Sequence, residues 1–168
     1  FAVNSVALVE GVPKVLSVPE LINYYIEHQI DVIQRRTKYR LQKAESRLHI
    51  VEGLILALDK IDQVIKTIRA SKDVETARNS LMKKFKLSET QASHILDMPL
   101  RRLTALEREK LEDEKTELKK TIKDLTSILK SRKKQDDLLI EELEEITNKF
   151  GGERRSRIVP DVGDVSIE

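Results

Sequence analysis

Cysteine and tryptophan are absent from this 168-residue sequence, and aromatic residues make up only 4% of it. Without cysteine the chain can form neither disulfides nor thiolate metal sites. Five glycines and four prolines leave few points at which a helix has to end. Charged residues make up 36% of the chain, with 31 basic and 29 acidic residues intermixed. This composition is typical of long helices and coiled coils rather than of a compact globule.

Long apolar runs are also missing. No stretch of about 18 uncharged apolar residues occurs, so we expect no membrane-spanning helix. The net charge of +2 does not by itself favour binding to nucleic acid or to a membrane surface. The chain begins Phe-Ala-Val, without an initiator methionine or a secretory signal peptide. We therefore interpret it as a piece of a longer protein.

The N-terminal part combines a short β-rich segment with a long helical one. In residues 1–16, valine-rich segments flank Glu10-Gly11-Val12-Pro13, which predicts a β-hairpin left over from a preceding domain. Ser17-Val18-Pro19-Glu20 then has the pattern of a capping box at a helix start. Apolar residues follow at steps of three or four and predict one helix from Ser17 to about Ala70. Such a helix would be roughly 80 Å long and needs a partner helix along its apolar seam.

A small helical domain is predicted beyond that seam. Residues 54–58 are apolar on all sides, so we assign 17–60 to a descending coiled-coil helix and 61–106 to the domain. Inside the domain, Asp73 or Ser71 would cap one short helix, and Ser88 would cap another. A break at Met98-Pro99-Leu100 follows.

The C-terminal part is predicted to return along the first helix. Thr104 would cap a helix, and we assign 107–150 to a returning coiled-coil helix with a break near 130–135. Its seam consists of Leu111, Leu118, Ile122, Leu125, Leu129, Leu139, Leu143, Ile146 and Phe150. Residues 151–168 would form a strand, near Ser156 to Val159, and a linker. The predicted fold is mainly α: a long antiparallel two-helix coiled coil with a helical domain at its tip and a short β-hairpin at the N-terminus.

Two surfaces are candidates for function. The antiparallel register brings two basic runs to the same level of the arm, where they would form a collar that attracts phosphates. The collar consists of Arg35, Arg36, Lys38, Arg40, Lys43, Arg132, Lys133 and Lys134. Neighbouring acidic residues support the alternative of ordinary solvated charge. At the tip, apolar residues exceed what so small a core can bury, which predicts a two-fold homodimer interface. Its candidates are Leu81, Phe85, Ile95, Leu96, Met98 and Leu100.

Catalytic, cofactor-binding and metal-binding residues are not predicted. The three histidines lie far apart in a hairpin model, and no glycine-rich phosphate loop or nucleophile elbow occurs.

Three segments nevertheless resemble a known family. These are Asp-Val-Ile-Gln-Arg-Arg-Thr-Lys-Tyr-Arg-Leu at 31–41, the block from Leu87 to Glu107, and Phe-Gly-Gly-Glu-Arg-Arg at 150–155. They resemble the type IIA topoisomerase A-subunit family, which DNA gyrase and topoisomerase IV share. The resemblance extends over nearly the whole chain, although Pro99 replaces a residue that is usually basic or polar. A proline there would stiffen the turn at the tip.

The resemblance implies the coiled-coil arm and exit gate (C-gate) of a bacterial cytoplasmic enzyme that supercoils DNA by ATP-dependent double-strand passage. It implies a homodimer through the tip, DNA as a partner, and a B subunit that carries the ATP and Mg²⁺ sites. The family's catalytic tyrosine follows an arginine, whereas Tyr24, Tyr25 and Tyr39 do not, so this part of the enzyme would not be catalytic. Two other interpretations remain open: a generic coiled-coil tether or scaffold with no DNA role, and a helical arm that binds RNA, as on some synthetases.

Overall fold

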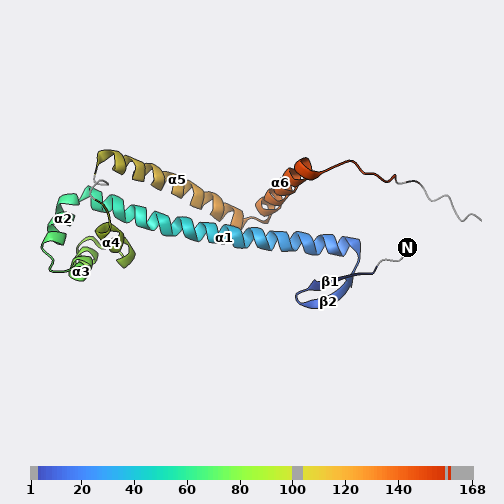
Figure 1. Ribbon diagram of the computed structural model, residues 1–168, viewed down its shortest axis with the longest axis horizontal. Coiled ribbons are helices and arrows are strands. Elements are labelled where there is room, and N and C mark those ends of the chain that lie inside the picture. The colour runs from blue at the N-terminus through green and yellow to red at the C-terminus, as the bar shows by residue number, and fades with distance from the viewer. Residues whose placement is uncertain (1–3, 100–103, 158, 160–168) are drawn as a thin grey trace, which may run out of the picture.

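The computed structural model describes residues 4–99, 104–157 and 159. They form an elongated, mainly helical arm with a β-hairpin near one end and a small helical domain at the other (Figure 1). The strands are β1 (Ser5–Val9) and β2 (Val12–Leu16). The helices are α1 (Val18–Asp59), α2 (Ile61–Arg69), α3 (Val74–Phe85), α4 (Glu89–Leu96), α5 (Ala105–Lys130) and α6 (Arg132–Phe150). The predicted fold class is confirmed.

The N-terminal hairpin forms as predicted. Strands β1 and β2 pair antiparallel, with Val9 opposite Val12. The two turn residues, Glu10 and Gly11, have φ angles of 53° and 79°, the positive values that the commonest two-residue hairpin turn requires. The strand predicted near Ser156 to Val159 is wrong for the described residues there, because none of them lies in a strand. Among the described residues the sheet has only the two strands of the hairpin, so the predicted third strand does not join it.

The long helix starts where predicted but ends earlier. The Glu20 carboxylate accepts hydrogen bonds from the Ser17 amide (2.7 Å) and from its hydroxyl (2.6 Å), which fixes the start of α1. The prediction of one helix as far as Ala70 is wrong, because the backbone leaves the helical conformation at Lys60, with φ −121° and ψ 33°. Beyond that point, Val64 is buried in the core of the tip rather than along the arm. Packing of α2 against α3 therefore turns the chain away from the axis of α1 (Figure 1).

The two long helices pack antiparallel, and their shared core runs into the tip. Three salt bridges join α1 to α5: Arg47 to Glu114, Glu52 to Lys119 and Asp59 to Arg108. The main core draws on helices α1 to α5 and on Leu87, which lies between α3 and α4. Leu118 packs at the edge of this core, in the same cluster as Ile55. The buried members of this cluster are Val51, Leu54, Ile55, Ala57, Val64, Leu81, Phe85, Leu87, Ala92, Ile95 and Leu111.

The returning helix breaks at Ser131, inside the predicted interval of 130–135. The buried Gln135 side chain donates to the Ile128 carbonyl at 2.9 Å, one of the carbonyls that the end of α5 leaves without a helical partner. Its amide oxygen accepts a hydrogen bond from Gln34 of α1. After this joint α6 inclines away from α1 (Figure 1). The predicted seam therefore ends early: Leu143 packs against α1, whereas Phe150 is 73% exposed.

Candidate dimerisation and nucleic-acid surfaces

Two capped helices build the tip. Asp73 accepts a hydrogen bond from the Thr76 amide at 2.7 Å and caps α3, and this bond lowers the pKa of the Asp73 carboxyl. Ser88 caps α4, where it exchanges hydrogen bonds with Gln91 in the predicted capping box. Because a local cap satisfies the first amides of each helix, α3 and α4 start at fixed points. They can then close over the end of α1.

A glycine allows α4 to approach α1 closely. A Cβ atom added at Gly53 would lie 2.7 Å from the Cγ of Gln91, nearer than real Cβ atoms come. The Gln91 amide donates to the His49 carbonyl at 2.7 Å, and the His49 ring bonds to the Ser88 hydroxyl at the same distance. We did not predict this contact from the sequence. The one available signal was a glycine inside an otherwise strong helix.

The structure divides the predicted dimer-interface residues into two groups. Leu81, Phe85 and Ile95 are buried in the core of a single chain, so they hold the tip together. Leu96 and Met98 are only half buried, and they line a groove on the surface of the tip. The sixth candidate, Leu100, lies outside the described residues. Dimerisation itself stays a prediction.

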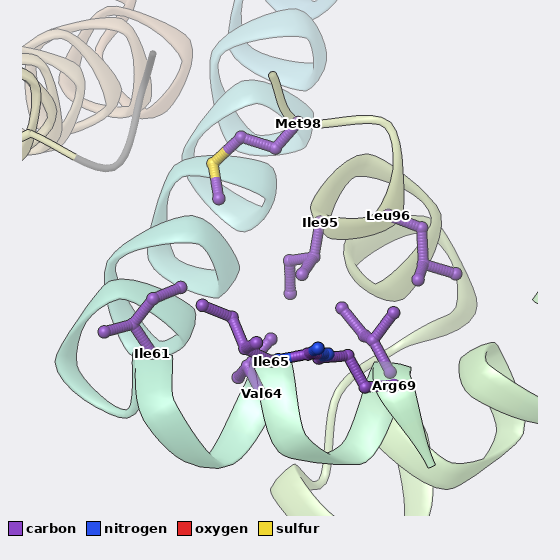
Figure 2. Close-up of a pocket in the computed structure, with 8 residues that line it drawn as sticks. Ile61, Val64, Ile65, Arg69, Ile95, Leu96 and Met98 are labelled. Carbon is purple, nitrogen blue, oxygen red and sulfur yellow. The ribbon is translucent and has the colours of Figure 1, made fainter. Parts of the chain in front are cut away.

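The tip groove is apolar and has a volume of about 230 Å³. Figure 2 shows that α2 contributes Ile61, Ile65 and Arg69, while α4 contributes Ile95 and Leu96 opposite them. Met98 adds its thioether just after α4, and Val64 and Ile68 complete the lining. We missed the share of α2 because we predicted α2 as a continuation of the arm helix. An open apolar groove of this kind suits an apolar protein surface as its partner.

The two basic runs lie on one level of the arm, as predicted. Gln34 hydrogen-bonds to Gln135, and Arg132 on α6 contacts Glu27 on α1. However, acidic neighbours neutralise three of the eight collar residues: Arg35 pairs with Asp31, Arg36 with Glu142, and Arg132 with both Glu27 and Asp136. The hydrogen bond from Arg132 lowers the pKa of the Glu27 carboxyl, and the pKa of Arg132 is raised in return.

The other five collar residues form no salt bridge with any described residue. They are Lys38, Arg40, Lys43, Lys133 and Lys134, and all five are exposed. The amine of Lys134 donates to the Ser127 hydroxyl at 3.0 Å. These five cations remain available to a phosphate, so the candidate DNA-facing set is smaller than the sequence indicated.

The described residues provide little for other kinds of site. Among them, no three histidine, aspartate or glutamate side chains lie close enough together to hold a metal ion. None of the described helices is both long and apolar enough to cross a membrane.

Comparison with known proteins places the chain in a family. The family model for the A subunit of DNA gyrase/topoisomerase IV matches residues 1–144. Over all 168 residues the chain is 48% identical to the DNA gyrase A subunit of Mycobacterium tuberculosis, and 49% identical to those of Aminobacterium colombiense and Clostridium acetobutylicum. The whole chain aligns in each case, but it spans only 20% of the first and third relatives and 21% of the second. The chain belongs to the DNA gyrase/topoisomerase IV A-subunit family.

Proposed function

We propose that this chain is the arm and exit-gate dimerisation module of a topoisomerase A subunit. The tip groove carries this proposal, because among the described residues it remains open after the core of the tip is complete. Ile65, at 38% exposure, and the half-buried Met98 lie in this groove at the far end of the arm. A second copy related by a two-fold axis would cover both grooves with one contact.

The arm supports this function as a spacer. Helix α1 has 42 residues and is therefore roughly 60 Å long. Its salt bridges to α5 include a two-point contact of Arg47 with Glu114, at 2.6 and 2.9 Å, which fixes both spacing and rotation. Two such arms joined at their tips would enclose a space wide enough for a duplex, with the exposed collar cations beside it.

The whole protein would then be a bacterial cytoplasmic enzyme. In this proposal it supercoils DNA by passing one duplex through a double-strand break in another, and the duplex leaves when the two tips part. A B subunit would supply the ATP and Mg²⁺ sites, and the nucleophilic tyrosine would lie outside this chain. A generic tether is the alternative, and a tether has no need of an open apolar groove on a compact tip.

Sedimentation equilibrium tests the gate. We expect the unmodified chain to be a dimer at tens of micromolar. Met98→Asp, which places a charge in the groove, should give a folded monomer with an unchanged helical circular dichroism spectrum. Ile140→Asp is the matched control, because Ile140 is 53% exposed on α6, far from the tip, and this variant should stay dimeric. A monomeric unmodified chain would favour the tether.

A further inference from the structure

A second hollow, which we call the α2–α3 cleft, lies on the tip and has a volume of about 340 Å³. Its polar lining consists of Lys66, Thr67, Ser71, Thr76, Ser80 and Lys84. All of these side chains end in hydroxyl or ammonium groups, so no carboxylate of the described part of the chain lines the cleft. Thr76, Ser80 and Lys84 are spaced by four residues and therefore form one stripe along α3. The stripe faces the C-terminal end of α2.

Hydrogen bonds hold part of this lining in place. Lys84 donates from α3 to the hydroxyl of Thr67 on α2 at 3.2 Å, so its ammonium group lies across the cleft. The Thr67 and Ser71 hydroxyls donate to backbone carbonyls of α2. The Thr76 hydroxyl bonds to the nearby Asp73 carboxylate. That carboxylate also accepts a hydrogen bond from the Thr76 amide at the start of α3. Lys84 is thus positioned before any ligand arrives.

The surroundings of the cleft are strongly basic. Residues 60–88 contain eight lysines and arginines but only three acids, which gives a net charge of +5 against +2 for the whole chain. Of these eight cations, only Arg78 forms a salt bridge with a described residue, through Glu89 at 3.5 Å. The collar differs, because three of its arginines are already paired. Unpaired cations of this kind attract polyanions over a distance of several ångströms.

We propose that the α2–α3 cleft binds a backbone phosphate of duplex DNA. Ammonium and hydroxyl groups are the usual partners of DNA phosphates, and such contacts are independent of base sequence. The donors that this cleft offers are the ammonium groups of Lys66 and Lys84 and the hydroxyl of Ser80, because the other three hydroxyls already donate to protein acceptors. A free nucleotide fits less well, because none of the described residues that line the cleft is an aromatic side chain on which a base would stack. The basic residues also extend beyond the cleft, as an extended polyanion requires. This inference rests on the proposed function in one respect: a gate at the tip brings a departing duplex past this surface.

Binding of a labelled duplex of mixed sequence, followed by fluorescence anisotropy at several salt concentrations, tests the site. The double variant Lys66→Gln/Lys84→Gln should bind about fivefold more weakly near 0.15 M salt, and its salt slope should fall by about one. The matched control is Lys120→Gln/Lys123→Gln, which removes two exposed lysines from α5 that form no salt bridge with described residues. The control should bind as the unmodified chain does. An equal loss in both variants would overturn the proposal, since only net charge would then matter.

Two further measurements separate the remaining outcomes. The amide NMR signals of Ser80 and Lys84 should shift on adding duplex DNA, at constant ionic strength. Saturating shifts with inorganic phosphate, but none with DNA, would show a site for a free anion and would overturn the proposal. Sedimentation of the same variants reports on dimerisation independently. A monomeric chain whose DNA affinity still depends on Lys66 and Lys84 would refute the gate and leave the phosphate site intact.

Discussion

Replacing Gly53 by alanine should destabilise this chain, although the same change stabilises most helices. Gly53 lies in the interior of α1, where alanine usually gains about 1 kcal/mol over glycine. Here the new methyl group would meet three atoms of Gln91, at 2.7, 2.9 and 2.9 Å. One of those atoms is the Cβ of Gln91, which cannot move without the backbone of α4.

The cost follows from what holds Gln91. Overpacking a core typically costs about 1–3 kcal/mol. If the Gln91 side chain rotates away instead, its amide loses the hydrogen bond to the His49 carbonyl. The loss of that hydrogen bond costs about 1 kcal/mol. After subtracting the helical gain, we expect Gly53→Ala to lower the free energy of unfolding by about 1 kcal/mol.

A double-mutant cycle in urea measures this coupling. Removing all three obstructing atoms with Gln91→Gly should reverse the sign, so that Gly53→Ala then stabilises the chain by about 1 kcal/mol. All four proteins must be compared at one concentration, because a dimer's stability depends on concentration. If Gly53→Ala stabilised the unmodified chain by its full helical gain, the close approach of α4 to α1 would be refuted.

Three other perturbations test the arm. Gln135→Leu removes the side-chain hydrogen bonds to the Ile128 and Leu129 carbonyls, of which Ile128 keeps only the bond from the Ser131 amide at 3.3 Å, and it should cost about 1–3 kcal/mol in urea denaturation. The pKa of Glu27 is lowered by Arg132, so its contribution to stability is present above the unfolded value of about 4.3 and is lost as pH falls through the folded pKa. The drop in melting temperature below about pH 4.3 should therefore be shallower in Glu27→Gln, and an unchanged drop would contradict this pairing. In the collar, Lys38→Gln/Lys43→Gln should reduce the salt slope of duplex binding by about one to two, whereas a slope equal to that of the unmodified chain would count against a DNA-facing collar.

Local signals in the sequence were enough to predict the ends of most elements. The caps at Ser17 and Ser88 were predictable because each depends on a partner three residues away. The break at Lys60 was not, because neither glycine nor proline marks it and packing of α2 on the tip decides it. The direction of α6 after Ser131 is equally non-local. Likewise, the role of Gly53 depends on Gln91, which lies far along the chain.

The candidate site was predictable only in part, for a related reason. Periodicity identifies which face of a helix is apolar, but it does not say whether the same chain or another one covers that face. The interface candidates that are buried in the core and those that line the groove therefore showed the same apolar periodicity in the sequence. In the collar, the sequence showed the basic runs and their level on the arm. It did not show which arginines the acids of the opposite helix would neutralise.

The difference between buried tip residues and groove residues decides which variants can test the gate. Leu81 is fully buried, so replacing it with aspartate would place an unpaired charge in the core and unfold the tip, whatever the tip binds. Loss of dimer in such a variant would say nothing about an interface. Met98 is different, because the groove leaves it half exposed and the charge of Met98→Asp can reach water in the monomer. Met98→Asp should therefore destabilise the dimer rather than the folded monomer. A folded monomer from this variant is evidence that the groove is the contact between two copies.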